Sequence, residues 1–150
     1  MDKPTNNSID TISRTCIAVR LRLLNRVVTN FYDDALRPLG LKVSQLNILI
    51  VTAKLGLARP AQVCDILQLD ASTLSRNVKP LQAHGWLEVV PDEDARAQPF
   101  RLTAQGKRLI EKAAPAWEQA QRRATELLGD EGVALLDRAA KKIGLSQAGR

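Results

Sequence analysis

Residues 60–103, PAQVCDILQLDASTLSRNVKPLQAHGWLEVVPDEDARAQPFRLT, contain the pattern that decides the fold. A short helix is predicted over residues 59–67, because Pro60 suits a first helical turn. A second helix is predicted over residues 71–83, where apolar side chains recur at helical spacing. The turn at residues 68–70 joins the two into a helix-turn-helix. The apolar stripe of the second helix consists of Ala71, Leu74, Val78 and Leu81.

A short hairpin is predicted directly after this motif. Residues 86–90, WLEVV, are rich in aromatic and β-branched side chains, which favour a strand. Residues 91–98, PDEDARAQ, form a charged loop. Residues 99–102, PFRL, return as a second strand, in which a proline is tolerated at the first position. A strand, a charged loop and a strand after a helix-turn-helix describe a wing, so the predicted fold is mainly α-helical with a small β-hairpin wing.

Two helices are predicted upstream of this centre. Apolar residues at three- and four-residue spacing indicate a first helix of about 25 residues that ends near Leu36. Ser44 is expected to cap a second helix over residues 45–54. The stripe of the first helix consists of Ile9, Ile12, Cys16, Val19, Leu23 and Val27, and the inward face of the second of Leu46, Leu49, Ile50 and Ala53.

A long helical pattern follows the hairpin, from Thr103 to Leu128. Pro115 is expected to kink it, since a proline removes one backbone hydrogen bond and crowds the preceding turn. Gly129 ends this helix, and a final helix follows. Both ends of the chain thus carry apolar stripes outside the compact centre, which predicts pairing with a second copy. The final stripe consists of Val133, Leu136, Ala140 and Ile143.

The length of 150 residues suits a single domain. We expect a winged helix-turn-helix lobe at residues 44–103, flanked by dimerisation helices at residues 10–37 and 104–145. The formal net charge of +6 favours a polyanionic partner such as nucleic acid. No stretch is long and apolar enough for a membrane span, so a cytoplasmic protein is expected.

Other classes of function find no support in the sequence. It contains no glycine-rich phosphate loop, no HExxH and no GxSxG motif, so an enzyme is not expected and no cofactor is predicted. Cys16 and Cys64 lie far apart without a CxxC motif, and His84 is the single histidine. Neither a disulfide scaffold nor a metal site is therefore expected.

The second helix of the motif presents a polar face that suits duplex DNA. On a helical wheel its apolar stripe turns inward, while Arg76 lies at the centre of the outward face. Arginine donates two hydrogen bonds to guanine, so Arg76 is the best candidate for a base contact. The alternative is an ordinary solvated helix face, which the neighbouring wing makes less attractive. The predicted DNA-contacting residues are Ser72, Thr73, Ser75, Arg76, Lys79, Asp94, Arg96 and Gln98.

The wing loop carries three carboxylates beside one arginine. The net negative charge of these four side chains would repel DNA, so the carboxylates are expected to have a role other than binding DNA. A carboxylate that grips an arginine fixes a loop from which another arginine reaches the narrow minor groove. We assign the anchoring role to Asp94 and the reaching role to Arg96.

The residues Asp94-Ala95-Arg96, followed by Leu102-Thr103 and Gly106, resemble the D-x-R wing and the L-T-x-x-G motif of the MarR family. Residues 41–90 are similar to the core of that family, and the similarity spans roughly residues 10–145. The resemblance implies a transcription regulator, expected to be a repressor, whose terminal helices intertwine in a dimer. Its two lobes would read a pseudo-palindrome, and a small molecule or oxidation would often release the DNA.

The resemblance does not identify the signal that would release the DNA. An aromatic or anionic effector is expected, but no residue is assigned to it. Cys16 invites comparison with the peroxide-sensing branch of the family, which supports its cysteine with tyrosines. This chain has only Tyr32, and Val43 stands at a tyrosine position, so a protonated, inert thiol is favoured. Cys64 is expected to be buried and structural.

Three further expectations concern the surroundings of residues 71–83, the helix predicted to enter the DNA groove, which we call the recognition helix. Pro80 departs from the family pattern and is placed on the outward face, where it should bend the last turn. His84 is expected to contact backbone or phosphate, and Trp86 and Trp117 to pack in the core. A rival function is an architectural protein that kept the fold but binds DNA without sequence preference, with a steep salt dependence.

Overall fold

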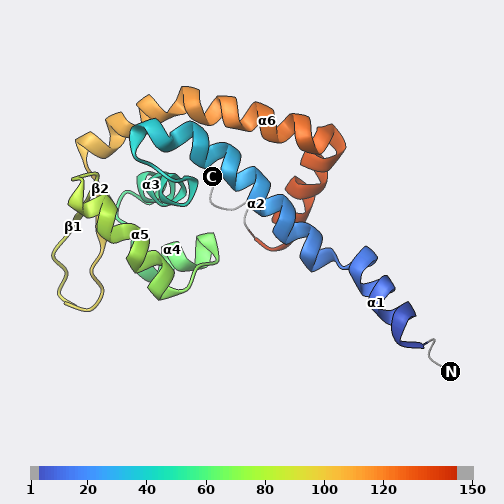
Figure 1. Ribbon diagram of the computed structural model, residues 1–150. Coiled ribbons are helices and arrows are strands. Elements are labelled where there is room, and N and C mark those ends of the chain that lie inside the picture. The colour runs from blue at the N-terminus through green and yellow to red at the C-terminus, as the bar shows by residue number, and fades with distance from the viewer. Residues whose placement is uncertain (1–3, 145–150) are drawn as a thin grey trace.

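A computed structural model describes residues 4–144, which fold into a helical lobe with a projecting hairpin (Figure 1). The mainly α-helical fold with an antiparallel two-stranded hairpin is the one predicted. Residue 145, the predicted end of the second dimerisation segment, lies outside the described residues. The elements are α1 Pro4–Thr15, α2 Ile17–Leu36, the 3-10 helix η1 Arg37–Leu39, α3 Val43–Leu55, α4 Pro60–Leu67, α5 Ala71–Ala83, β1 Leu87–Val89, β2 Phe100–Leu102 and α6 Ala104–Lys142.

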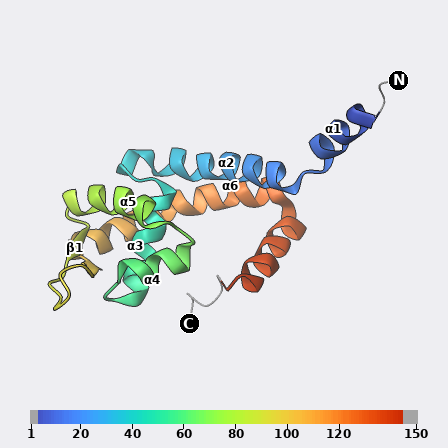
Figure 2. The same ribbon diagram turned by 90° about the horizontal axis from the view of Figure 1, so that it is seen from below.

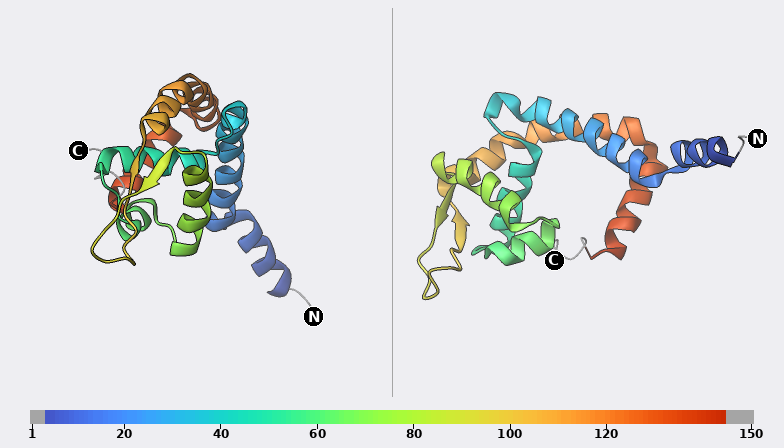
Figure 3. Two further views of the ribbon diagram at one scale, coloured as in Figure 1. Left: turned by 90° about the vertical axis from the view of Figure 1, so that its left-hand side faces the viewer. Right: turned by 60° about the horizontal axis from the view of Figure 1, so that its bottom comes forward.

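The prediction of one continuous first helix is wrong. Cys16 has an extended backbone, with φ −63° and ψ 110°, and separates α1 from α2. The hydroxyls of Thr11 and Thr15 each donate to a carbonyl one turn earlier, at 2.7 Å, a contact that often bends helices. As a result, α1 projects away from the rest of the molecule (Figures 1 and 3).

Helices α2 and α6 lie side by side, although they come from opposite ends of the chain (Figure 2). The Tyr32 hydroxyl on α2 donates to Oε1 of Gln121 on α6. The guanidinium of Arg123 lies 4.2 Å from the ring centre of Phe31, a favourable cation–π distance. Together the two helices form an arm on which the lobe is mounted.

Helix α6 breaks at Gly129, where the sequence predicted a stop. Gly129 has φ 69° and ψ 166°, a conformation that glycine adopts without a Cβ clash, and it is the residue of α6 that departs from helical geometry. The dihedrals stay helical at Pro115, so α6 continues past this proline. The carbonyl that loses its partner belongs to Glu111, which is exposed and open to water.

The start of α3 differs from the prediction that Ser44 caps it. The N–H of Val43 donates at 2.8 Å to Oδ1 of Asp33, which comes from α2. The side chain of Gln45 accepts the N–H of Lys42 at 3.0 Å. Ser44 instead lies inside the first turn, and its hydroxyl contacts Oδ1 of Asn77 on α5 at 3.3 Å. A carboxylate supplied by a distant helix therefore takes the capping role.

The core lies between α3, α4, α5 and the base of the hairpin. On α3 the buried side chains include Ile48, Val51 and Thr52, because this helix is packed on more than one side. The predicted inward positions Ile50 and Ala53 are exposed, which corrects that expectation. The core cluster consists of Leu36, Leu41, Leu46, Ile48, Leu49, Val51, Ala58, Val63, Leu74, Val78, Leu81, Leu87, Phe100 and Ala113.

Both predicted strands are confirmed, each shorter by one or two residues. Leu87 pairs with Leu102, and Val89 pairs with Phe100. Ala58, just before α4, forms an isolated bridge with Phe100 and so ties the base of the hairpin to the helix-turn-helix. Within residues 4–144, no helix combines the length and the apolar character that a membrane span requires.

Candidate nucleic-acid interface

The predicted helix-turn-helix is formed by α4 and α5, joined by a turn that the backbone itself closes. Gln68 adopts a left-handed conformation, with φ 52°, at the end of α4. The N–H of Leu69 then donates to the carbonyl of Cys64 at 2.9 Å. This tight turn sets α5 across α4, and the polar face of α5 stays exposed.

The carboxylate of Asp70 caps the N-terminus of α5. Its Oδ1 accepts the N–H of Thr73 and the hydroxyl of Ser72, both at 2.7 Å, and its Oδ2 accepts the Thr73 hydroxyl at 2.9 Å. The hydrogen bond from Ser72, then those from Thr73, lower the pKa of Asp70 to about 2. Ser72 and Thr73 thus already donate their hydroxyl hydrogens within the protein. Their contact with DNA stays a prediction.

We expect Asp70→Ala to lower the melting temperature at neutral pH, because it removes the acceptor that holds the first turn of α5. The pKa of Asp70 is about 2 in the folded protein against 3.8 for a free carboxyl. Its stabilisation is therefore present above the unfolded-state pKa and disappears as the pH falls through the folded-state value. Thermal unfolding of both proteins from neutral to strongly acidic pH measures this.

The melting-temperature difference between wild type and Asp70→Ala should shrink in acid. Asp70→Asn retains an acceptor oxygen and serves as the control, with a smaller loss at neutral pH. A difference that stays constant from neutral to acidic pH would show that the ionised carboxylate is not what stabilises α5.

A cleft of about 240 Å³ lies between α5 and the wing, and Leu74, Val78 and Phe100 are among the residues that line it. Ser75, Lys79 and Gln82 line it from α5, and Arg96 and Gln98 line it from the wing. Four of the eight predicted contact residues are thus brought to one concave face. Sequence reasoning missed Gln82, whose signal is its helical spacing from Ser75 and Lys79.

Arg76 lies on the exposed surface of α5 and does not line this cleft. One of its guanidinium nitrogens, Nη2, donates to the Thr73 hydroxyl at 3.3 Å, a long hydrogen bond that leaves the other donors available. The position at the centre of an exposed helix face is the one expected for a residue that reads a base.

The prediction that Pro80 lies on the outward face of α5 is wrong. Pro80 is half-buried and lines a pocket of about 440 Å³ together with Asp33 and Lys42. Helical geometry continues past it to Ala83. His84 contacts the backbone as predicted, with Nδ1 2.7 Å from the carbonyl oxygen of Pro80. The proline therefore faces α2 and α3, away from the polar face of α5.

The wing loop is anchored by Asp92, and the anchoring role predicted for Asp94 is wrong. Oδ2 of Asp92 lies 3.0 Å from Nη2 of Arg59, at the start of α4. Asp94 forms no ion pair with any residue between 4 and 144, and its Oδ1 instead accepts the N–H of Arg96 at 3.0 Å. The pKa of Asp92 is lowered by the hydrogen bond from the N–H of Asp94 and, to a lesser degree, by Arg59. The side chain of Arg96 is exposed at the loop.

The L-T-x-x-G motif joins α6 to the end of the recognition helix. The Thr103 hydroxyl accepts the N–H of Gly106 at 3.0 Å and donates to the carbonyl of Gly85 at 2.6 Å. Gly106 packs directly against the backbone, since a Cβ there would lie 2.2 Å from the carbonyl oxygen of Trp86. The start of α6 is thus in close backbone contact with the turn before β1.

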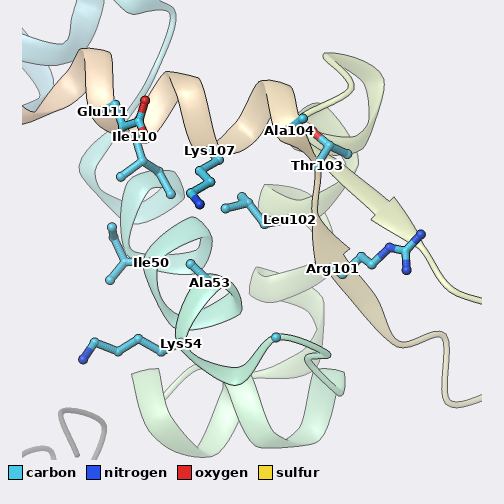
Figure 4. Close-up of a pocket in the computed structure, with 11 residues that line it drawn as sticks. Ile50, Ala53, Lys54, Arg101, Leu102, Thr103, Ala104, Lys107, Ile110 and Glu111 are labelled. Carbon is cyan, nitrogen blue, oxygen red and sulfur yellow. The ribbon is translucent and has the colours of Figure 1, made fainter.

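Two adjoining cavities are lined by residues of α3 and of the first half of α6. The larger, about 600 Å³, is lined by Ile50, Leu102 and Ile110, and the side chain of Lys107 points from α6 into it (Figure 4). The smaller, about 420 Å³, shares Ile50 and Ile110 and adds Trp117. The predicted core packing of Trp117 is wrong, because its side chain is 40% exposed.

The two cysteines lie in different parts of the fold. Cys16 is partly buried at the break between α1 and α2. Cys64 packs against the lobe core, and its burial, with the charges of Asp65 and Asp70, raises the pKa of its thiol. A raised pKa keeps a thiol protonated and unreactive, in line with the structural role predicted for Cys64. No group of potential metal ligands occurs among the described residues.

A helix-turn-helix followed by a hairpin that flanks the recognition helix defines the winged helix class. Residues 39–97 match the MarR family. The winged helix-turn-helix part of this chain is therefore similar to that of the MarR family of transcription regulators.

Two curated proteins illustrate the similarity in sequence, and one of them is a transcriptional regulator by name. The uncharacterised HTH-type transcriptional regulator YwoH of Bacillus subtilis is 26% identical over 87 residues, which cover 58% of this chain and 64% of YwoH. The multiple antibiotic resistance protein MarR of Salmonella typhimurium is 27% identical over 124 residues, covering 81% of this chain and 85% of MarR.

Solved structures share the fold. A mutant of MarR from E. coli in complex with operator DNA superposes with a TM-score of 0.77 at 22% identity, covering 89% of this chain and 97% of MarR. BpsR of Bordetella bronchiseptica, whose DNA binding is regulated by 6-hydroxynicotinic acid, superposes with a TM-score of 0.72 at 20% identity, covering 85% of this chain and 93% of BpsR.

Proposed function

We propose that this protein binds a pseudo-palindromic operator as a homodimer in the cytoplasm, represses transcription there, and is released by a small-molecule effector. The observation that carries the proposal is the cleft that brings Ser75 and Lys79 of α5 together with Arg96 and Gln98 of the wing. A helix and a wing converging in this way suit a major groove and the adjoining minor groove. Arg76 adds a base-reading group beside the cleft.

The homodimer is supported by apolar side chains that a single chain leaves in water. On α1 and at the start of α2, Ile9, Ile12 and Ile17 are each at least 61% exposed. Leu135 on the last part of α6 and Ile143 directly after it are 60% and 66% exposed. Exposed apolar surface of this extent marks an interface, and two copies related by a twofold axis would present two recognition helices to a symmetric site. Further exposed residues in these segments are Val19, Leu21, Leu23, Leu24, Val27, Leu127 and Leu136.

The effector site is supported by the two cavities between α3 and α6. Their volumes of about 600 and 420 Å³ lie in the range of small-molecule sites. Apolar walls with the Lys107 amine inside favour an aromatic anion. A ligand there would contact both the arm and the lobe, and could therefore change the angle at which the two recognition helices are presented.

The experiment is a selection of random duplex DNA on the purified protein, followed by titration of the enriched pool at two salt concentrations. We expect an inverted repeat, bound by a protein that sediments as a dimer at micromolar concentration. Benzoate and 6-hydroxynicotinic acid, both aromatic anions, are then added to the complex as first probes of release.

The outcomes separate the parts of the proposal. No enrichment despite salt-sensitive binding would favour the architectural alternative, since phosphate contacts alone carry no sequence preference. A monomer in sedimentation would overturn the homodimer. A complex that no aromatic acid releases would overturn the effector class while leaving DNA recognition in place.

A further inference from the structure

Within residues 4–144, one side-chain hydrogen bond connects the loop of the wing between residues 91 and 98 to another element. The hairpin backbone pairing ends where the N–H of Val90 donates to the carbonyl of Pro99 at 2.8 Å. Beyond that point, among residues 4–144, the ion pair of Arg59 with Asp92 is the one hydrogen-bonded contact from the loop to another element.

From this contact a chain of hydrogen bonds leads to the exposed arginine of the loop. Asp92 uses both carboxylate oxygens, Oδ2 toward Arg59 and Oδ1 to accept the N–H of Asp94 at 3.0 Å. Asp94 in turn accepts the N–H of Arg96 at 3.0 Å. Each carboxylate therefore holds the backbone two residues further on, and the position of Arg96 depends on where Arg59 holds Asp92.

Arg59 is itself fixed by its neighbours. It stands directly before Pro60, the first residue of α4, and its N–H donates to the side chain of Gln62 at 3.2 Å. The preceding residue, Ala58, exchanges two backbone hydrogen bonds with Phe100, at 2.8 and 2.9 Å. The anchor point is therefore part of the rigid base of the helix-turn-helix.

We propose that Arg59 and Asp92 are positioning residues of the wing, which hold the loop so that Arg96 is presented to DNA beside the recognition helix. The proposal rests on the DNA-binding function proposed above. In this role the Arg59–Asp92 pair affects DNA affinity through the position of the loop, and neither side chain has to contact DNA.

The substitution Asp92→Asn separates positioning from charge by the sign of its effect. It removes a negative charge from a DNA-facing loop, which by charge alone should tighten binding. If the pair positions the wing, binding should instead weaken, by an expected 3- to 10-fold in Kd, on the order of one lost surface contact. Glu93→Gln is the matched control, since it changes the charge equally and Glu93 forms no hydrogen bond or ion pair with the described residues. Tighter binding in both variants would overturn the proposal.

Two further comparisons test whether the pair acts through Arg96. In an Arg96→Ala background, Asp92→Asn should no longer weaken binding and should change Kd only as much as Glu93→Gln does, through its charge. The double variant Arg59→Gln with Asp92→Asn should bind no more weakly than Arg59→Gln alone, because both substitutions break the same contact. If Arg59 contacted a phosphate on its own, the effects would add and the salt slope would fall by about one. That result would overturn the positioning role of Arg59.

A measurement without DNA keeps this inference separate from the proposed function. In the free protein, backbone 15N relaxation should show residues 93–97 becoming more mobile in Asp92→Asn and Arg59→Gln and unchanged in Glu93→Gln. Unchanged mobility in all three variants would overturn the inference even if the wild type binds an operator. Failure of the wild type to bind DNA would overturn the proposed function alone.

Discussion

Replacing Arg76 by alanine is expected to weaken operator binding by about 1–3 kcal/mol at each half-site, or about 5- to 150-fold per contact. The guanidinium is exposed on α5 and held only by a 3.3 Å hydrogen bond to the Thr73 hydroxyl, so it is free to donate two hydrogen bonds to a guanine. The variant should also lose its preference at one base step per half-site. Competition with duplexes altered at single positions measures both effects.

Two other arginine variants separate base reading from general electrostatics. Arg96→Ala should weaken binding across sequences, because the wing reads the shape of the minor groove more than base identity. Arg122→Ala removes the same charge from an exposed position on α6, a helix that contributes nothing to the cleft, and should change the affinity little. Unchanged binding in both Arg76→Ala and Arg96→Ala would refute the assignment of the reading surface.

The second large effect is expected for Gly106→Ala, which should destabilise the fold by about 2–4 kcal/mol. A Cβ at this position would lie 2.2 Å from the carbonyl oxygen of Trp86 and 2.7 Å from Cδ1 of Leu102. The carbonyl cannot easily retreat, because it also accepts the N–H of Thr103 at 3.1 Å. Thermal unfolding followed by circular dichroism should show a melting temperature lower by about 5–15 °C.

Gly132→Ala is the matched control in the same helix. The nearest atom to its added Cβ is the side-chain Cβ of Leu128 at 3.1 Å, and the better helix propensity of alanine offsets that tight contact. Its stability should therefore change by less than about 1 kcal/mol. A loss in Gly106→Ala no larger than in Gly132→Ala would contradict the close packing of α6 on the turn before β1.

Much of the fold was predictable because its signals are local. The stripe of Leu74, Val78 and Leu81 recurs at helical spacing, and all three side chains are buried in α5. Gly129 breaks α6 as predicted, because a glycine at the end of an apolar pattern is a strong local stop signal. Where a local signal was overruled, another segment supplied the partner. The capping role predicted for Ser44 is taken by Asp33 on α2, which accepts the N–H of Val43.

The candidate site was predictable as a set of residues on α5 and the wing but not as an arrangement. Helical spacing identified Arg76 and Lys79, and the loop composition identified Arg96. It did not place Pro80, which packs toward α2 and α3 because those helices lie against that side of α5. It also chose the wrong anchoring carboxylate, since both Asp92 and Asp94 stand in the same charged loop.

The sequence by itself determined the order of the elements, the helix-turn-helix, the wing and the polar face of α5, because periodicity, caps and turns act over a few residues. Only the tertiary structure decided that Arg59 holds Asp92 from 33 residues away, that Ile50 opens into a cavity, and that α5 and the wing enclose a cleft. These contacts depend on how distant segments pack around a shared core, and no local pattern in the chain encodes which surface charges will meet.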